Sequence, residues 1–129
     1  MTYEKVTEGL HTAEFILSEG NGYRSRETVT LAEGESVKAG ELLGKITSGG
    51  EYAAWDPAAG DGSETIAGIS YAEVDATDAA ASITAVVRDA EVDLGALVYP
   101  EENSAGDGGA EDATAGLLTL GIITRARGA

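Results

Sequence analysis

The sequence contains no cysteine and a single histidine, and these two shortages exclude several kinds of chemistry. Without cysteine, the chain has no disulfide and no thiolate nucleophile or ligand. The one histidine, His11, would have to serve any Ser–His–Asp arrangement or zinc site alone, from near the N-terminus. We therefore expect that the protein is not an enzyme and that it has no cofactor, no metal and no small-molecule substrate.

Basic residues are also few. The chain has 8 Lys and Arg against 23 Asp and Glu, so its net charge is −15. Phosphate backbones and anionic lipid surfaces would repel such a chain, and we expect neither nucleic acid nor a membrane as a partner. No apolar run approaches the length of about 18 residues that a transmembrane helix needs. The charged N-terminus also lacks the apolar segment of a secretory signal, which predicts a protein made in a cytoplasm.

Aromatic residues make up 5% of the chain, although 43% of its 129 residues are hydrophobic. The core must therefore consist mainly of Val, Ile, Leu and Ala. This length suits one domain, because two halves would each bury too little apolar surface. The 18 glycines indicate many turns and argue against a helical bundle.

The pattern of apolar and β-branched residues predicts a mainly β, β-clip-like domain with a short C-terminal helix. The helix is expected over residues 110–121, where Ala113, Leu117 and Leu120 share a face and acidic residues occupy the first turn. Turn-forming glycines separate the expected strands. These strands fall within residues 28–31, 41–47, 51–55, 65–71, 82–88 and 122–125. A shorter extended piece is expected within 36–40, and a short strand followed by a helical turn that ends at Pro100 is expected from residue 91 on.

Residues 1–22 are polar and weakly periodic, which predicts an extended N-terminal arm ahead of a single domain over residues 23–129. The segment "AEFILS" (13–18) is its one apolar run. This run is also consistent with an ordinary first strand of the domain. The sequence leaves both interpretations open.

The stretch "GGEYAAWDPAAGDGSETIAGIS" (49–70) raises the question of a ligand loop. Asp56, Asp61 and Glu64 lack the alternating spacing by which a calcium loop converges its oxygen ligands. The nearby "GELLGKIT" (40–47) fails as a phosphate loop, because it has three residues between its glycines and Ile46 follows the lysine. We therefore interpret residues 49–70 as a strand, a structural turn and a second strand. The turn residues are Trp55, Asp56, Pro57, Gly60 and Gly62.

One alternative from another functional class is a lipoyl- or biotinyl-type carrier domain. The segment "EGESVKAGELLGKI" (33–46) is similar to the turn–strand rhythm of those domains. They display a modified lysine at a hairpin tip. Lys38 in Val-Lys-Ala and Lys45 in Gly-Lys-Ile do not match that local pattern, so the resemblance is weak.

An ordered series of segments resembles the lambda-type bacteriophage head decoration proteins. The series is "SRETVTLAEGESVKAGELLGKIT" (25–47), "YAAWDPAAGDGSETIAGIS" (52–70), "ALVYPE" (96–101) and "LGIITR" (120–125). The resemblance covers residues 25–125 and is most specific between residues 42 and 101. Two features depart from the family: the first residues are richer in charge, and Tyr99 stands where a tryptophan is expected.

The resemblance implies a capsid-stabilising protein on the outer surface of the virion. Members of this family form homotrimers that sit at three-fold positions of an expanded phage head. There they clamp the major capsid protein and resist the pressure of packaged DNA. A cement of this kind needs no reactive group and should avoid nucleic acid, as expected above for this chain.

Two sets of residues are candidates for these contacts. We hypothesise that the arm adds as a strand to an edge of the capsid protein, with Phe15 and Leu17 supplying specificity. This capsid-binding segment comprises Glu14, Phe15, Ile16, Leu17 and Ser18. A trimer would cohere through apolar segments such as "LGALV" (94–98) and "LLTLGII" (117–123), unless the domain's own core buries them. The trimer contacts that we select are Leu97, Val98, Tyr99 and Pro100.

Overall fold

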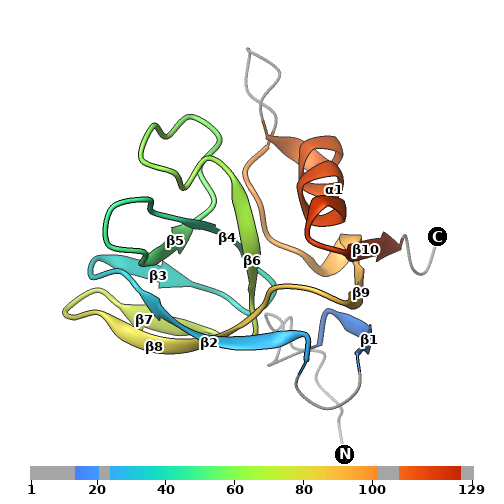
Figure 1. Cartoon of the computed structure of the whole chain (residues 1–129), viewed down its shortest axis with the longest axis horizontal. Helices are drawn as coiled ribbons and strands as arrows, with labels where there is room; N and C mark the ends of the chain where they lie inside the picture. Colours follow the sequence, from blue (N-terminus) through green and yellow to red (C-terminus); the bar gives the residue numbers. More distant parts are fainter. Residues whose placement is uncertain (1–13, 21–23, 102–107, 126–129) are drawn as a thin grey trace, which may run out of the picture.

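The structure is a computed structural model that describes residues 14–20, 24–101 and 108–125 (Figure 1). Within these residues the chain forms short strands, one 3-10 turn (Leu94–Ala96) and one helix, α1 (Gly109–Thr119). The strands are β1 (Ile16–Glu19), β2 (Arg26–Leu31), β3 (Glu35–Val37), β4 (Leu42–Lys45), β5 (Tyr52–Ala54), β6 (Ile66–Ser70), β7 (Val74–Ala76), β8 (Ala81–Val86), β9 (Ala90–Asp93) and β10 (Ile122–Arg125).

Five strands close into a small barrel in the order β2-β5-β4-β6-β8. Its longest ladder joins β2 and β8 antiparallel, from Arg26 opposite Val86 to Leu31 opposite Ala81. A separate three-stranded sheet has the order β1-β9-β10, in which β9 pairs antiparallel with β1 and parallel with β10. A two-stranded antiparallel ladder of β3 and β7 completes the β structure.

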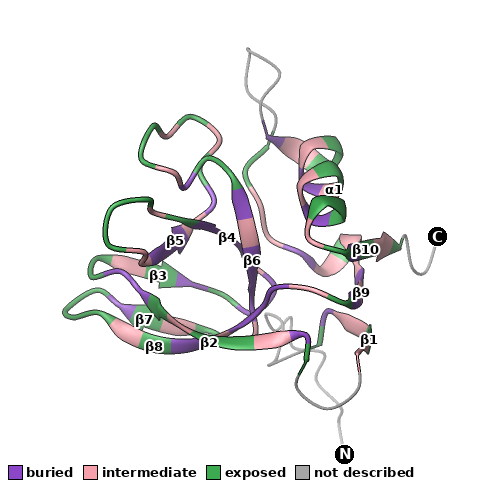
Figure 2. Ribbon diagram, in the orientation of Figure 1, coloured by how far each residue is buried: buried purple, intermediate pink, exposed green. Residues whose placement is uncertain are grey.

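The buried hydrophobic side chains form two cores. Figure 2 shows the buried positions in purple along the strands and the helix. Side chains alternate between the faces of a strand, so β8 contributes Ile83 and Ala85 to one core and Val86 to the other. The barrel core also holds Leu31, Val37, Leu43, Tyr52, Ala76 and Val87. The second core, called the inter-sheet core below, holds Phe15, Leu42, Trp55, Ile66, Ile69, Val86, Ala90, Val92, Leu97, Ala113, Leu117 and Ile122.

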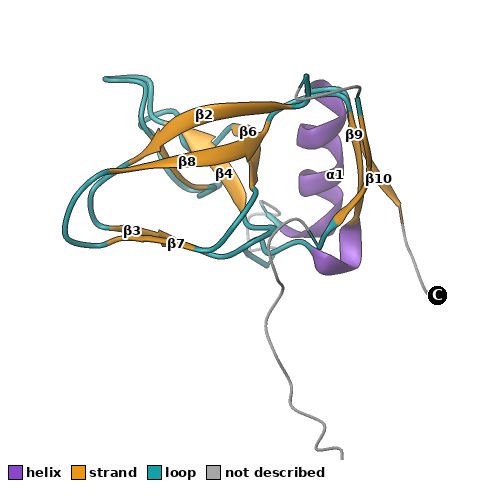
Figure 3. Ribbon diagram, turned by 90° about the horizontal axis from the view of Figure 1, so that it is seen from below, coloured by secondary structure: helices purple, strands orange, loops and turns teal. Residues whose placement is uncertain are grey.

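Helix α1 packs between β6 of the barrel and β10 of the three-stranded sheet (Figure 3). Ala113 and Leu117 form its buried stripe, as the spacing predicted, whereas Leu120 follows the last helical residue and is half-buried. Gly116 faces β6 so closely that an added β-carbon would lie 2.5 Å from Ile66 Cδ1. The Asp112 carboxylate accepts a 2.9 Å hydrogen bond from the Gly108 main-chain N–H. Main-chain N–H groups at the start of a helix have no partner within the helix, and Asp112 supplies one here.

The predicted class, a mainly β domain with a short C-terminal helix, is confirmed. The pattern did not predict β7, because "VDA" has too little apolar alternation and forms a strand only by pairing with β3. In the described ranges, no helix is both long and apolar enough to cross a membrane.

Candidate functional site

The apolar N-terminal run is part of the folded domain in this structure. Phe15 is completely buried in the inter-sheet core, and β1 pairs with β9 from Ile16 opposite Val92 to Glu19 opposite Ala90. The expected domain boundary at residue 22 therefore falls after a strand of the domain. Phe15 has no exposed surface in the single chain, and the contact with a capsid protein expected for it stays a prediction. Residues 1–13, the rest of the predicted arm, lie outside the described residues.

The other residues of that run keep surface that a partner can reach. Ile16 and Leu17 are half-buried, whereas Glu14 and Ser18 are exposed. Strand β1 lies at one edge of its sheet, with β9 on its other side. The structure thus leaves β1 as an edge strand, the type of element to which an extended chain can add.

A partly buried ion pair ties the end of β1 to the start of β2. Arg26 donates from Nε to Glu19 Oε2 at 2.9 Å and from Nη2 to Glu19 Oε1 at 2.5 Å. The hydroxyl of Ser25 also donates to Glu19 Oε2. The hydrogen bonds from Arg26 and Ser25 hold the pKa of Glu19 below its ordinary value of 4.5, although partial burial opposes this shift.

A polar network crosses the outer face of the three-stranded sheet. Glu91 on β9 accepts a 3.0 Å hydrogen bond from Ser18 Oγ on β1 and a 2.8 Å bond from Arg125 Nε on β10. These two donors lower the pKa of Glu91, with Arg125 having the larger effect. Next to them lies a shallow hollow of about 260 Å³, lined in part by Ser18, Arg24, Asp89 and Ile123.

The loop between β5 and β6 is held by its own polar groups. Asp56 accepts from the Ala58 N–H at 3.0 Å, and Asp61 accepts from both the N–H and the hydroxyl of Ser63 at 3.0 and 2.6 Å. Glu64 accepts from the Gly62 N–H at 2.8 Å. The carboxylates thus stabilise the turn by local bonds to the chain, as the strand–turn–strand interpretation predicts.

The five residues singled out in this loop have different environments. Trp55 is buried in the inter-sheet core, Pro57 is half-buried, and Asp56 and Gly60 are exposed. Gly62 adopts φ +110°, and a β-carbon there would lie 2.7 Å from the Lys45 carbonyl oxygen. A residue with a side chain would be strained at this position.

The segment selected for trimer contacts is divided between the core and the surface. Leu97 is buried in the inter-sheet core, and Val98 is hydrogen-bonded through its main chain to Gly40 and Leu42. Tyr99 is half-buried against the same core, and Pro100 is exposed. Tyr99 and Pro100 therefore keep surface for a neighbouring copy, whereas the side chain of Leu97 does not.

Two large hydrophobic side chains in the described residues are strongly exposed. Leu118 on α1 is 63% exposed and Ile123 on β10 is 42% exposed. Both fall within the apolar segment 117–123, but periodicity could not say which of its members the domain buries. Leu117 and Ile122 are completely buried, so Leu118 and Ile123 are the ones that remain at the surface.

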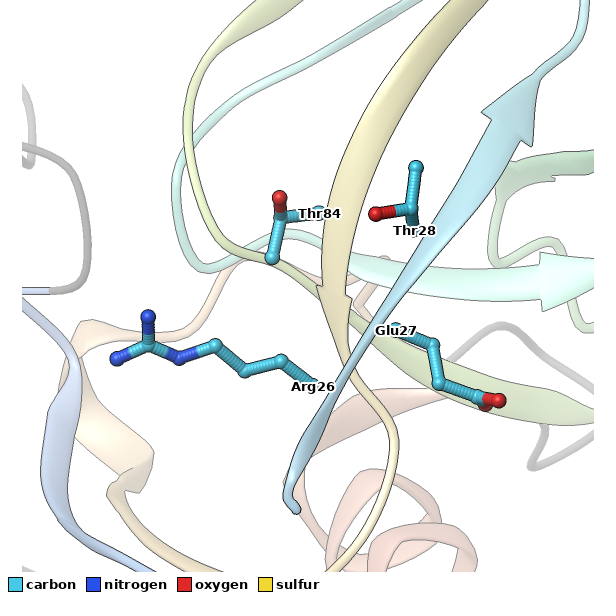
Figure 4. A pocket seen from close by; sticks show the side chains of 4 residues that line it. All are labelled: Arg26, Glu27, Thr28 and Thr84. Atoms are coloured by element: carbon cyan, nitrogen blue, oxygen red, sulfur yellow. The ribbon is translucent and has the colours of Figure 1, made fainter. Parts of the chain in front are cut away.

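The described residues contain no cluster of side chains suited to metal binding. No group of three or more His, Cys, Asp or Glu residues in this part of the chain could hold a metal ion. A shallow groove of about 220 Å³ lies over β2 and β8, lined by Arg26, Glu27, Thr28 and Thr84 (Figure 4). Arg26 and Glu27 point away from one another there.

The comparisons with known proteins assign the chain to a family. The family model described as "Bacteriophage lambda head decoration protein D" matches residues 5–122, which is most of the chain. No curated protein matches the sequence. The matched range includes β1 to β9 and α1 and ends at the first residue of β10.

Proposed function

The chain belongs to the bacteriophage lambda head decoration protein D family, and from this premise we propose that it binds the major capsid protein as a homotrimer and stabilises the expanded head. Membership of this family makes it a structural protein of the phage capsid surface, in a family that is not one of enzymes. The proposal is more specific than family membership in three respects: the homotrimer, the capsid subunit contacted, and resistance to the pressure of packaged DNA. The family match over residues 5–122 is the observation that carries it.

The charge of the chain supports a position on the outside of the shell. At −15 per copy, the protein would be repelled by DNA within the head. High charge also keeps a concentrated cement protein soluble before it binds. Assembly must therefore depend on local contacts, since long-range attraction to another acidic copy is absent.

We propose that the capsid contact is made by the N-terminal segment together with β1. Residues ahead of Phe15 would add to a capsid strand, while β1 continues into the domain's own sheet. Ordering each residue of such a segment costs about 1–2 kcal/mol, so one segment would bind weakly. Three segments on one trimer would gain from effective concentration. This modifies the expected strand at residues 14–18, because Phe15 is in the core.

The trimer contact should use side chains that the single chain leaves exposed. In the structure these are Pro100, the outer part of Tyr99, Leu118 and Ile123. Burying apolar surface between copies, away from the carboxylates, would offset the repulsion between three acidic chains. We propose these four residues as the candidates for the contact between copies.

A binding experiment tests this function. Expanded heads lacking decoration protein are incubated with the purified chain, sedimented, and examined by electron microscopy for density at the three-fold positions. Decorated heads should also withstand heating that bursts undecorated ones. The mass of the free protein by light scattering should be three times that of the chain. Heads that remain bare and unprotected at saturating protein would contradict the proposal.

The carrier-domain alternative has no observation in its favour beyond the local rhythm noted in the sequence. Lys38 is exposed after β3, and Lys45 ends β4 with its ammonium 5.9 Å from the Tyr52 ring centroid. A carrier domain would acquire an acyl group on one of these lysines in cells. Intact mass spectrometry of the protein from its native source should show an unmodified chain.

A further inference from the structure

A hollow of about 290 Å³ lies between the loop that joins β5 to β6 and helix α1. Both elements meet β6, because the loop leads into this strand and α1 packs against it (Figure 1). The hollow is lined in part by Trp55, Pro57, Glu64, Ile66, Asp112 and Gly116. None of these residues belongs to β1 or to the proposed trimer contact, so the hollow is a separate feature of the surface.

One part of the lining is apolar and is fixed by the packing of the domain. Trp55 and Ile66 are members of the inter-sheet core, and Pro57 beside them is half-buried. Gly116 of α1 adds no side chain to the hollow, and its close approach to Ile66 holds the helix against β6. The apolar wall is therefore present before any partner binds.

The other part of the lining is acidic. Glu64 Oε1 accepts a 2.8 Å hydrogen bond from the Gly62 N–H, and Asp112 Oδ2 accepts a 2.9 Å bond from the Gly108 N–H. These bonds hold one oxygen of each carboxylate but bring no opposite charge. Within the described ranges, neither carboxylate forms an ion pair with a lysine or an arginine. The hollow thus presents two acidic groups that a cation from another molecule can reach.

This combination suits a long cationic side chain. The methylene stem of lysine or arginine packs along apolar surface while its charged end stays in a polar environment. Hydrogen bonds between such a cation and a carboxylate are stronger than those between neutral groups. A purely apolar side chain would instead shield the two carboxylates from water without offering them a partner, which costs free energy. The chemistry of the lining therefore favours an alkylammonium or alkylguanidinium group.

A second copy of this chain has few cations to offer. Each arginine in the described residues forms an ion pair within its own chain: Arg24, Arg26, Arg88 and Arg125. Of the two described lysines, Lys45 has its ammonium 5.9 Å from the Tyr52 ring centroid, which leaves Lys38. Two copies that each carry a net charge of −15 also repel one another. A different protein is therefore the better source of the cation.

We propose that the hollow at Trp55, Glu64 and Asp112 binds a lysine or arginine side chain of the capsid protein. The stem lies along the apolar lining, and the charged end reaches the two carboxylates. This inference rests on the proposed capsid-binding function. It adds to that function a second contact, made by the β5–β6 loop and α1 and independent of the N-terminal segment.

A small-molecule probe tests the hollow without the capsid. Trp55 is the chain's one tryptophan, so its fluorescence reports on this site alone. The cationic probe is N-butylguanidinium, and N-butylurea is a neutral probe of nearly the same shape. We expect a saturable change of emission with N-butylguanidinium and a much smaller change with N-butylurea. No change with either probe, or equal changes with both, would overturn the inference.

A charge-removing variant and a matched control extend this test. The double variant Glu64→Gln/Asp112→Asn keeps an oxygen acceptor for each main-chain N–H and removes both charges. The control Glu73→Gln/Asp78→Asn makes the same chemical change at two exposed positions outside the hollow. Circular dichroism establishes that both variants are folded. The response to N-butylguanidinium should be lost in the double variant and kept in the control, and an unchanged response in the folded double variant would contradict the site.

Binding to undecorated heads then tests the partner. The Glu64→Gln/Asp112→Asn variant should bind about tenfold more weakly than the unmodified chain at low salt, and its affinity should depend less on salt. The control variant should match the unmodified chain in both respects. If the double variant binds heads with the original affinity and salt dependence, the inference is overturned and the proposed function stands. If the unmodified chain does not bind heads, the proposed function itself is overturned.

Discussion

The indole nitrogen of Trp55 donates a 2.8 Å hydrogen bond to the main-chain carbonyl of Glu64, and this bond closes the loop between β5 and β6. Trp55 →Phe should lower the free energy of unfolding by about 1–3 kcal/mol, because a shielded carbonyl loses its partner and the smaller ring leaves space in the core. Urea unfolding followed by circular dichroism measures this change, since the variant lacks the chain's one tryptophan. An unchanged midpoint would show that the bond does not hold the loop.

Gly44 on β4 lies beneath the same loop. A β-carbon there would be 2.6 Å from the carbonyl carbon of Ser63, so Gly44→Ala should destabilise the domain by about 1–3 kcal/mol. The matched control is Gly60→Ala, because a β-carbon at Gly60 meets nothing within 4 Å. That control should stay within about 0.5 kcal/mol of the unmodified protein. Thermal unfolding gives the melting temperature of each variant. Equal changes in melting temperature for Gly44→Ala and Gly60→Ala would show that the backbone at Gly44 does not lie close to Ser63.

Of two N-terminal deletions, only the longer one should affect folding. Removing residues 1–13 retains Phe15 and β1, so the domain should unfold at the same urea concentration as the full chain. Removing residues 1–20 deletes both, and the loss of a buried phenylalanine alone costs about 3–5 kcal/mol. The shorter deletion should nevertheless abolish binding to heads. A stable domain after the longer deletion would contradict the assignment of β1 to the fold.

The ionisation of Glu19 should make the stability of the domain depend on pH. Its pKa is lowered in the folded state, so its contribution is fully present above pH 4.5 and is lost as pH falls through the lower, folded-state value. The Glu19→Gln variant should therefore lose less free energy of unfolding below pH 4.5, so that its stability falls less steeply as the pH is lowered. Urea unfolding from neutral pH to about pH 2.5 measures this difference. If the free energy of unfolding depends on pH in the same way in both proteins, the ionisation of Glu19 does not contribute to the acid sensitivity of the domain.

Leu118 offers a direct test of the contact between copies. Leu118→Glu places a charge on a side chain that is 63% exposed in the single chain, so the fold should be unaffected. If the proposed trimer buries Leu118, a charge placed there between acidic copies should raise the dissociation constant of that trimer by about a hundredfold. Light scattering over a range of concentrations measures the mass. The control Ser48→Glu alters an exposed turn and should keep the mass of the unmodified protein.

Local patterns in the sequence determined the class of the fold and most of its elements. Strand β10 was predicted at residues 122–125 as observed, and the stripe of Ala113 and Leu117 identified α1. These signals are local, because alternation and helical spacing record which face of an element is buried. The ordered segments also carried the family resemblance, which the match over residues 5–122 bears out.

Contacts between distant residues decided what the patterns left open. "AEFILS" fits an arm or a first strand equally well, and burial of Phe15 against Val92 and Leu117 in one core assigns it to the domain. Similarly, Leu117 and Leu118 are chemically identical in the sequence, and packing against β6 and β10 buries one and exposes the other. The sequence by itself determined most of the elements, because their preferences are local. Only the tertiary structure decided which surfaces remain for a partner, because burial depends on what the rest of the chain places beside each residue.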